Sequence, residues 1–303
     1  MRTVARIVGF LMLIPMFLSA ATLVRSARTL LERGGRPALR DAVTLMACAV
    51  LLSVCAYAAW FVWPLLSGTY ALPRDPEAAR SLGSLLIAPG KSLLVVVAHP
   101  DDAEWYAGGT LALASSLGAD VHVLVATNGE RGRGNADAEA LALQRKREQE
   151  EAGRVLGYSR LVFLELPDRG LRRSSRLADL IRSEMVSVMP DLVLTFDAER
   201  PARPYVHPDH QAVGWAVLEL LEGELGDGAT AALFSSASPD AAVDITAVVE
   251  KKAAAVSSHR SQMADRGGWG AVRQNREIGK FVGYEYAELF RVSRTSSIRR
   301  TSR

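Results

Sequence analysis

Two long apolar runs open the chain, and shorter apolar runs recur at intervals after them. Residues 7–24 and 42–66 are almost continuously apolar, and each is about as long as the roughly 20 residues with which a helix crosses a bilayer. Two tryptophans and a tyrosine gather towards the end of the second run, as they do at membrane interfaces. The pattern predicts a hairpin of two transmembrane helices within residues 1–67.

Each run has an alternative interpretation. The first resembles a signal peptide, because Arg2 and Arg6 precede it and small residues occupy positions 19–21. The second could be a buried core helix, although it holds no charged residue. A transmembrane hairpin explains both runs together, because the second follows the first so closely.

The basic residues predict the orientation of this hairpin. The connector between the two runs carries five arginines against two acidic residues, namely Arg25, Arg28, Arg33, Arg36 and Arg40 against Glu32 and Asp41. Basic loops stay on the cytoplasmic side. We therefore expect a two-pass cell-membrane protein whose main domain faces away from the cytoplasm.

After the second run, the pattern becomes that of an α/β domain. Residues 68–90 are rich in proline and glycine and are predicted to form a linker, with a short helix near 77–82. The globular domain is expected at 91–291, followed by a basic, disordered tail at 292–303 that could contact anionic lipids. The net charge of +3 gives no case for nucleic-acid binding.

Within 91–291, apolar runs of strand length alternate with helical periodicity. The predicted strands are 93–98, 121–127, 161–164, 192–196 and, more weakly, 231–235. The predicted helices are 108–117, 138–156, 177–189, 208–221 and 245–258. Strands that alternate with helices indicate right-handed βαβ units and a parallel sheet covered on both faces.

Polar residues cluster where two of these strands end. His99, Asp101 and Asp102 follow the first strand, and His207, Asp209 and His210 follow the strand at 192–196. Ligands bind at the carboxyl ends of strands in open α/β sheets. If the two strands are neighbours, both clusters meet at one edge of the sheet.

The residue types in these clusters suggest metal-assisted hydrolysis of an amide or ester. His99, Asp102 and His210 would form a set of three protein ligands, as in catalytic zinc sites. Asp101 could accept the proton of the attacking water. His207 could stabilise an oxyanion, and Asp209 could hold that imidazole.

The chain resembles the PIG-L/LmbE-like family of zinc-dependent N-acetylglucosamine deacetylases. The motifs that carry the resemblance are Ala98–Glu104, Gly108-Gly109-Thr110, His207-Pro208-Asp209-His210, Thr127-Asn128-Gly129-Glu130, Leu166-Pro167-Asp168 and His259-Arg260-Ser261-Gln262. The resemblance covers the globular domain only and implies a Rossmann-like fold.

The resemblance also implies a role for each motif residue. It implies a Zn²⁺ cofactor on His99, Asp102 and His210, with Asp101 as general base. His207 would support the oxyanion and protonate the leaving amine, tuned by Asp209. The resemblance further implies that three residues contact an amino-sugar substrate, namely Glu130, Arg145 and Asp168. Many members have glutamate directly after the two aspartates, where this chain has Ala103; Glu104 is assigned no catalytic role.

Three functional hypotheses remain open. The first is a membrane-anchored zinc deacetylase of an N-acetylated amino sugar, which the anchor would bring close to lipid-linked or envelope saccharides. The second is a zinc hydrolase of another N-acyl substrate. The third is a sugar- or lipid-binding membrane protein without catalytic activity, against which the full ligand set and Asp101 argue.

Overall fold

The computed structural model describes residues 46–53, 71–133, 137–202, 206–223, 229–263 and 267–294. The chain divides into two compact units, Met1–Tyr70 and Ala71–Arg303. In the first unit residues 46–53 are helical; the predicted span 7–24 and the rest of 42–66 lie outside the described residues. None of the described helices combines the length and the apolar character needed to cross a bilayer.

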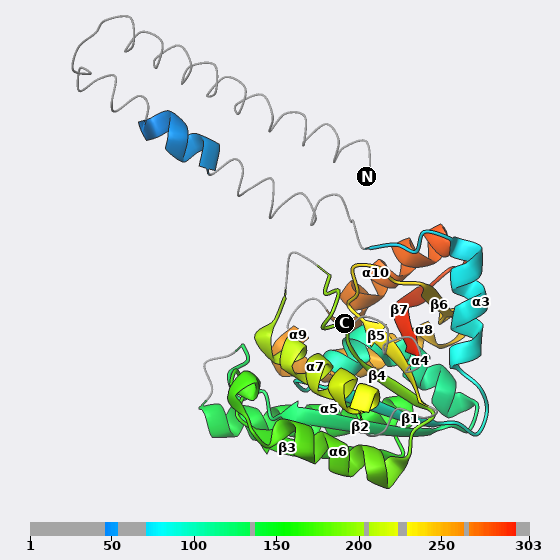
Figure 1. The fold of residues 1–303 in the computed structure, drawn as a ribbon, viewed down its shortest axis with the longest axis horizontal. Helices are drawn as coiled ribbons and strands as arrows, with labels where there is room; N and C mark the ends of the chain where they lie inside the picture. The colour runs from blue at the N-terminus through cyan, green and yellow to red at the C-terminus, as the bar shows by residue number, and fades with distance from the viewer. Residues whose placement is uncertain are drawn as a thin grey trace, which may run out of the picture. The chain divides into compact units, whose positions relative to one another are not determined.

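The described part of the second unit is built on a seven-stranded sheet (Figure 1), ordered β3-β2-β1-β4-β5-β7-β6. The strands are β1 Ser92–Val97, β2 Asp120–Thr127, β3 Arg160–Leu166, β4 Leu192–Phe196, β5 Thr230–Phe234, β6 Ala241–Asp244 and β7 Ala287–Arg294. Pairing is parallel from β3 through to β5 and antiparallel between β7 and its two neighbours. The predicted α/β fold with a mostly parallel sheet is confirmed.

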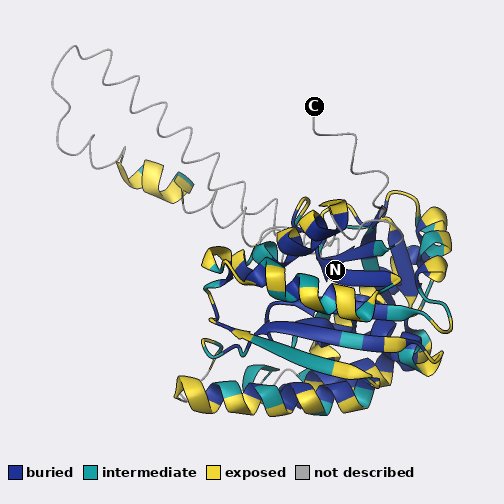
Figure 2. Ribbon diagram, turned by 60° about the horizontal axis from the view of Figure 1, so that its bottom comes forward, coloured by how far each residue is buried: buried dark blue, intermediate teal, exposed yellow. Residues whose placement is uncertain are grey.

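Helices cover both faces of this sheet. They are α3 Pro76–Leu86, α4 Asp102–Ser116, α5 Ala138–Leu156, α6 Leu177–Val188, α7 Pro208–Gly223, α8 Val249–Ser258, α9 Arg260–Met263 and α10 Gly267–Val282, with short 3₁₀ turns η1 Leu171–Arg173 and η2 Thr246–Val248. α6 and α7 contact each other over β1, whereas α4 contacts β1, α5 and α8. Figure 2 shows buried residues along the inner strands of the sheet, between the outer helices. Because β1 and β4 are covered on both sides, their unbroken apolar runs are buried.

The helix after β1 begins earlier than predicted. α4 starts at Asp102, not at Gly108, so Asp102 and Glu104 lie in its first turn. Carboxylates in the first turn of a helix interact favourably with its dipole. The early start fixes Asp102 on a helical backbone at the end of β1.

Residues 76–86 of the predicted linker form a helix that is longer than the short one predicted near 77–82. α3 extends from Pro76 to Leu86, and the Asp75 carboxylate caps it by accepting from two backbone N–H groups. α3 contacts β6 and α10, and a Cβ on Gly83 would lie only 1.9 Å from the carbonyl oxygen of Ala242. This close packing places the beginning of the compact unit at Ala71.

The C-terminal part of the domain contains elements that were not predicted. β6, α10 and β7 have short or interrupted apolar patterns, so neither periodicity stands out in the sequence. β7 continues past the predicted domain end at residue 291, to Arg294, where it pairs with Thr230. The predicted tail beyond that residue lies outside the described part.

Candidate active site

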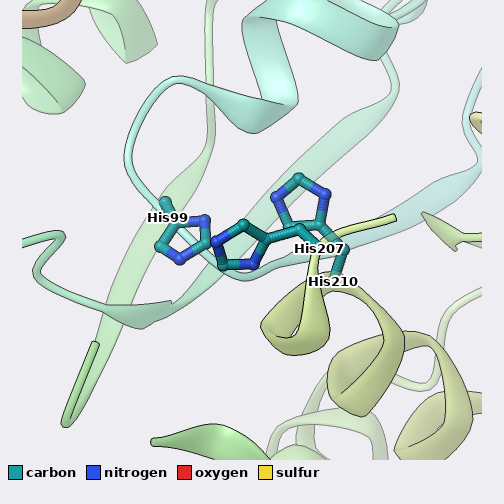
Figure 3. A group of neighbouring side chains, drawn as sticks. All are labelled: His99, His207 and His210. Carbon is teal, nitrogen blue, oxygen red and sulfur yellow. The ribbon is translucent and has the colours of Figure 1, made fainter. Parts of the chain in front are cut away.

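The two polar clusters meet at one edge of the sheet because β1 and β4 are parallel neighbours. Asp102 begins α4 directly after β1, and His207 and His210 flank the start of α7 after β4. Figure 3 shows the three imidazoles of His99, His207 and His210 gathered in one group. Their ring centroids are 4.8–5.3 Å apart.

Asp102 joins two of these imidazoles. One of its carboxylate oxygens lies 3.3 Å from His99 Nδ1, and the other lies 3.3 Å from His210 Nε2. The backbone N–H of His99 also donates to Asp102, at 2.8 Å. Burial would raise the pKa of Asp102, but the two imidazoles hold it well below its usual value. The three predicted metal ligands are thus brought together around an ionised carboxylate.

His99 is surrounded by further carboxylates. Its Nε2 atom lies 3.2 Å from Asp168 and 3.5 Å from Asp209. Burial works against a charged ring, yet hydrogen bonds to Asp102, Asp168 and Asp209 raise the pKa of His99 well above its ordinary value. For Asp168, burial is outweighed by His99, and the pKa falls to about 2. A buried concentration of negative charge therefore surrounds one imidazole.

The contacts of the Asp209 carboxylate differ in part from the predicted contact with His207. Its carboxylate accepts from the backbone N–H groups of Arg169, at 2.6 Å, and Leu171, at 3.1 Å, and it faces His99. Its own backbone N–H donates to His207 Nδ1, at 3.2 Å. A neutral His207 ring that accepts at Nδ1 carries its proton on Nε2.

The charges around His207 favour that neutral ring. Burial, together with the positive charges of His99 and His210, lowers the pKa of His207. A neutral imidazole with a proton on Nε2 can donate a hydrogen bond to a developing oxyanion.

Asp101 is held in an unusual backbone conformation. Its φ angle is 104°, in the left-handed region that costs a residue with a side chain about 1–3 kcal/mol. The Gln149 amide oxygen accepts from its backbone N–H at 3.0 Å, and Arg145 Nη2 lies 3.1 Å from its carboxylate. Burial raises the pKa of Asp101 to about 6, although Arg145 opposes the rise. A carboxylate with such a pKa suits a general base near neutral pH.

The predicted substrate-binding residues link the surrounding loops. Arg145 is buried and donates to the carbonyl oxygens of Gly129 and Pro100 as well as contacting Asp101. Glu130 accepts from the backbone N–H of Asp168 at 2.8 Å. Arg145 and Asp168 line the central pocket, whereas Glu130 ties the ends of β2 and β3 together.

Residues that were not predicted to take part support this arrangement. The Phe196 ring stacks on His210 with centroids 3.9 Å apart. Behind Asp101, the buried Glu104 carboxylate accepts from the Gln149 amide at 2.6 Å and lies 3.1 Å from His259 Nε2. The His259-Arg260-Ser261-Gln262 motif was a signal for His259, but nothing in the sequence pairs it with a residue 155 positions away.

A pocket of about 1040 Å³ opens over these groups. His99, Asp101, Asp102, His207 and His210 lie on its lining, and arginine and tryptophan side chains join them at other points. The volume lies just above the usual range for small-molecule sites, about 300–1,000 Å³. The pocket therefore brings the acid, base and imidazole groups to one solvent-accessible place.

Two overlapping donor groups among the described residues could hold a metal ion. One is His99, His207 and His210, and the other is His99, Asp168 and Asp209. Imidazole nitrogens and carboxylate oxygens are the ligands that zinc takes in catalytic sites. The fold and pocket thus define an α/β protein with a candidate His/Asp metal centre at the carboxyl ends of its strands.

Comparison with known proteins gives the family. The PIG-L family model, described as GlcNAc-PI de-N-acetylase, matches residues 94–221. A Bacillus cereus protein named as a probable N-acetyl-α-D-glucosaminyl L-malate deacetylase is 30% identical over 199 residues, which cover 57% of this chain and 84% of that protein. The chain belongs to the PIG-L family.

A solved structure and a second relative extend the comparison. The N,N′-diacetylchitobiose deacetylase from Pyrococcus horikoshii superposes with a TM-score of 0.62 and 28% identity, covering 68% of this chain and 85% of that one. A 4-oxalmesaconate hydratase from Pseudomonas putida is 32% identical over 199 residues, covering 57% of this chain and 75% of the hydratase. One relative is thus named for a different reaction.

Proposed function

We propose that this chain is a membrane-anchored, zinc-dependent N-deacetylase that hydrolyses the acetamide of an N-acetylglucosamine-type saccharide. The observation that carries the proposal is the juxtaposition of Asp101 with the cluster of His99, Asp102 and His210 in one pocket. The family membership supports the reaction, and the pocket chemistry supports the assignment of individual residues.

The donor set fits a divalent cation. Asp102, Asp168 and Asp209 lie within 3.5 Å of imidazole nitrogens, so three buried carboxylates converge on the imidazole groups. Buried charges are normally paired or coordinate metals. His99, Asp102 and His210 would hold the ion, and His207 and Asp168 stand beside them. A bound Zn²⁺ supplies Lewis acidity, which activates water at neutral pH and polarises a carbonyl group.

The side chains then divide the proton transfers between them. Asp101 accepts the proton of the attacking water, because it is ionised above a pKa of about 6. The Nε2–H of His207 stabilises the oxyanion of the tetrahedral intermediate. Since the C–N bond breaks only when the amine is protonated, Asp101 donates to the leaving nitrogen the proton that it took from the water. Arg145 holds Asp101 in place, and Asp168 helps to bind the sugar.

The membrane anchor is proposed from the sequence pattern. The apolar runs at 7–24 and 42–66 support two spans, and the five arginines between them support a cytoplasmic connector. The main domain would then face away from the cytoplasm and meet lipid-linked or envelope saccharides, with membrane lipids as neighbours. Reporter fusions after Tyr70 and within residues 25–40 are expected on opposite sides of the membrane. A cytoplasmic signal from the Tyr70 fusion would reverse the orientation.

The reaction is tested with the full chain purified in detergent and supplied with zinc. Acetate release is measured from a panel of N-acetylglucosamine conjugates and from other N-acyl compounds. We expect turnover on an amino-sugar conjugate and a loss of at least about 100-fold in kcat for Asp101→Asn. Zinc binding without turnover on any amide would favour the non-catalytic binding hypothesis. Unchanged turnover in Asp101→Asn would remove Asp101 as the base.

A second candidate reaction comes from the hydratase relative. Its 32% identity makes addition of water to a carbon–carbon double bond worth testing with 4-oxalmesaconate in the same preparation. Loss of the conjugated absorbance of that substrate, without acetate release from any amide, would favour hydration over deacetylation.

A further inference from the structure

Besides the buried Arg145, four arginine side chains line the pocket. Arg131 and Arg133 come from the loop after β2, Arg169 comes from the loop after β3, and Arg273 comes from α10. All four residues are exposed. Guanidinium groups bind oxyanions through charge-assisted hydrogen bonds, so arginines at the rim favour a negatively charged group in the pocket.

The backbone of the β2 loop is fixed while its guanidinium groups remain available. The Asp168 carboxylate accepts from the backbone N–H of Arg131 at 3.0 Å. The Gln262 amide accepts from the backbone N–H of Arg133 at 3.0 Å and donates to its carbonyl oxygen at 3.1 Å. Within the described ranges, no carboxylate forms an ion pair with either guanidinium group. These contacts hold the arginines at the rim without using their charges.

The same loop lies directly on buried side chains. A Cβ on Gly132 would lie 2.6 Å from Arg145 Nη1 and 2.7 Å from Gln262 Oε1. Those separations are too short for a Cβ, so the ends of the Arg145 and Gln262 side chains would have to shift if residue 132 carried one. The loop therefore forms a closely packed part of the pocket wall.

α10 adds an aromatic ring and a fourth guanidinium group. Trp269 and Arg273 are four residues apart, so they share a helix face, and both line the pocket. A Cβ on Gly268 would lie 1.7 Å from the carbonyl oxygen of Ala253, which shows how closely α10 approaches α8. α10 also lies outside the segment 94–221 that matches the family model.

We propose that Arg131, Arg133 and Arg273 form a subsite for an oxyanion, a phosphate or a carboxylate, attached to the amino sugar. Guanidinium groups bind both oxyanions through charge-assisted, often bidentate hydrogen bonds. Trp269 packs against the saccharide beside that group. The inference rests on the proposed deacetylase function and narrows its substrate to anionic amino-sugar conjugates.

Three substrates test the subsite with the full-length enzyme. They are methyl N-acetylglucosaminide, which is neutral, N-acetylglucosamine 1-phosphate, and an N-acetylglucosaminyl malate, which carries carboxylates. We expect kcat/KM to be highest for one of the anionic substrates, and the better of the two identifies the oxyanion. In Arg273→Gln the preference for that substrate over the neutral one falls about tenfold, as for the loss of one charge-assisted contact. Because this contact acts equally on bound substrate and transition state, the change appears in KM.

Arg276→Gln provides the matched control. Arg276 is an exposed arginine on the same helix, three residues further on, and it does not line the pocket. Its substitution changes the net charge equally and is expected to leave the preference as in the wild type. An equal fall of the preference in both variants would show a general charge effect and would refute the subsite.

A binding measurement separates this inference from the proposed reaction. Calorimetry with Asp101→Asn compares N-acetylglucosamine 1-phosphate and the malate conjugate with methyl N-acetylglucosaminide, and it requires no turnover. Tighter binding of an anionic ligand, weakened by Arg273→Gln, supports the subsite even if no acetate is released in the wild type. Equal binding of all three ligands refutes the subsite, and it does so even where the wild type deacetylates the neutral compound.

Discussion

Replacement of Gln149 by leucine tests whether the buried residues behind Asp101 control the reaction. Gln149 is fully buried. Its amide oxygen accepts from the backbone N–H of Asp101 at 3.0 Å, and its amide nitrogen donates to Glu104 at 2.6 Å. Leucine fills nearly the same space and removes both hydrogen bonds.

The magnitude follows from what each lost bond leaves behind. Glu104 keeps its contacts with Tyr158 and His259 but loses one hydrogen bond to a charged group, which costs about 1.5–3 kcal/mol of unfolding free energy. Asp101 loses the bond that helps to hold its φ of 104°, so its backbone is free to relax. A displacement of about 1 Å in a reacting group can lower kcat about 100-fold.

Steady-state kinetics, urea unfolding and metal analysis measure these effects together. We expect Gln149→Leu to lower kcat about 100-fold with little change in KM, to lower the unfolding free energy by about 2 kcal/mol, and to retain zinc. Gln144→Leu is the control, because Gln144 is an exposed glutamine on the same helix that bonds to Glu148. If Gln149→Leu lost the expected unfolding free energy but kept a kcat within twofold of the wild type, Asp101 would be shown to keep its position without Gln149.

Four further substitutions test the metal site, the sheet and the pocket wall. His210→Ala is expected to lose zinc, whereas His207→Ala retains zinc and loses kcat; metal analysis distinguishes them, and equal zinc loss would place His207 among the ligands. Arg291→Met removes the guanidinium partner of the buried Asp197 carboxylate, with contacts of 2.6 and 2.8 Å, and should cost about 3–5 kcal/mol in urea unfolding at pH 7. Burial opposes the ionisation of Asp197, but Arg291 keeps its pKa low. The stability that the ion pair contributes is therefore present above about pH 4 and is lost as the pH falls through the lower folded pKa. A loss of unfolding free energy in Arg291→Met that stays constant down to pH 2 would contradict the assignment. Gly132→Ala forces carbon against two side chains and should raise KM for anionic substrates by about tenfold, as for the loss of one charge-assisted contact; unaltered kinetics would show that the loop position is unimportant.

The sheet edge and its main residues could be predicted because their signals are local. The apolar runs identified β1 and β4, and the polar clusters around His99 and His210 come after those runs in the chain. Only one further condition was needed, namely that the two strands pair in parallel, and they do. The helix predicted at about Ala138 to Leu156 has those bounds in the structure, where Asp137 caps its start and Gly157 follows its end.

The supporting contacts could not be predicted because they depend on loop geometry and long-range packing. The Asp209 carboxylate faces His99 because two backbone N–H groups at residues 169 and 171 hold it, and no pattern encodes that turn. Glu104 looked like a favourable charge in a first helical turn. Its burial against His259 follows only from the packing of α8 on α4.

The position of β7 has a consequence for the order in which the chain can complete its fold. β7 lies between β5 and β6, both of which precede it in the chain. During synthesis β5 therefore presents an open edge, and β6 has no strand beside it, until residues 287–294 have emerged. Arg291 belongs to the same strand, so the Asp197 carboxylate after β4 also lacks its counterion until this strand has been synthesised. Chains that stop short of β7 would expose both an unpaired strand edge and an uncompensated carboxylate, which makes them candidates for aggregation and for degradation.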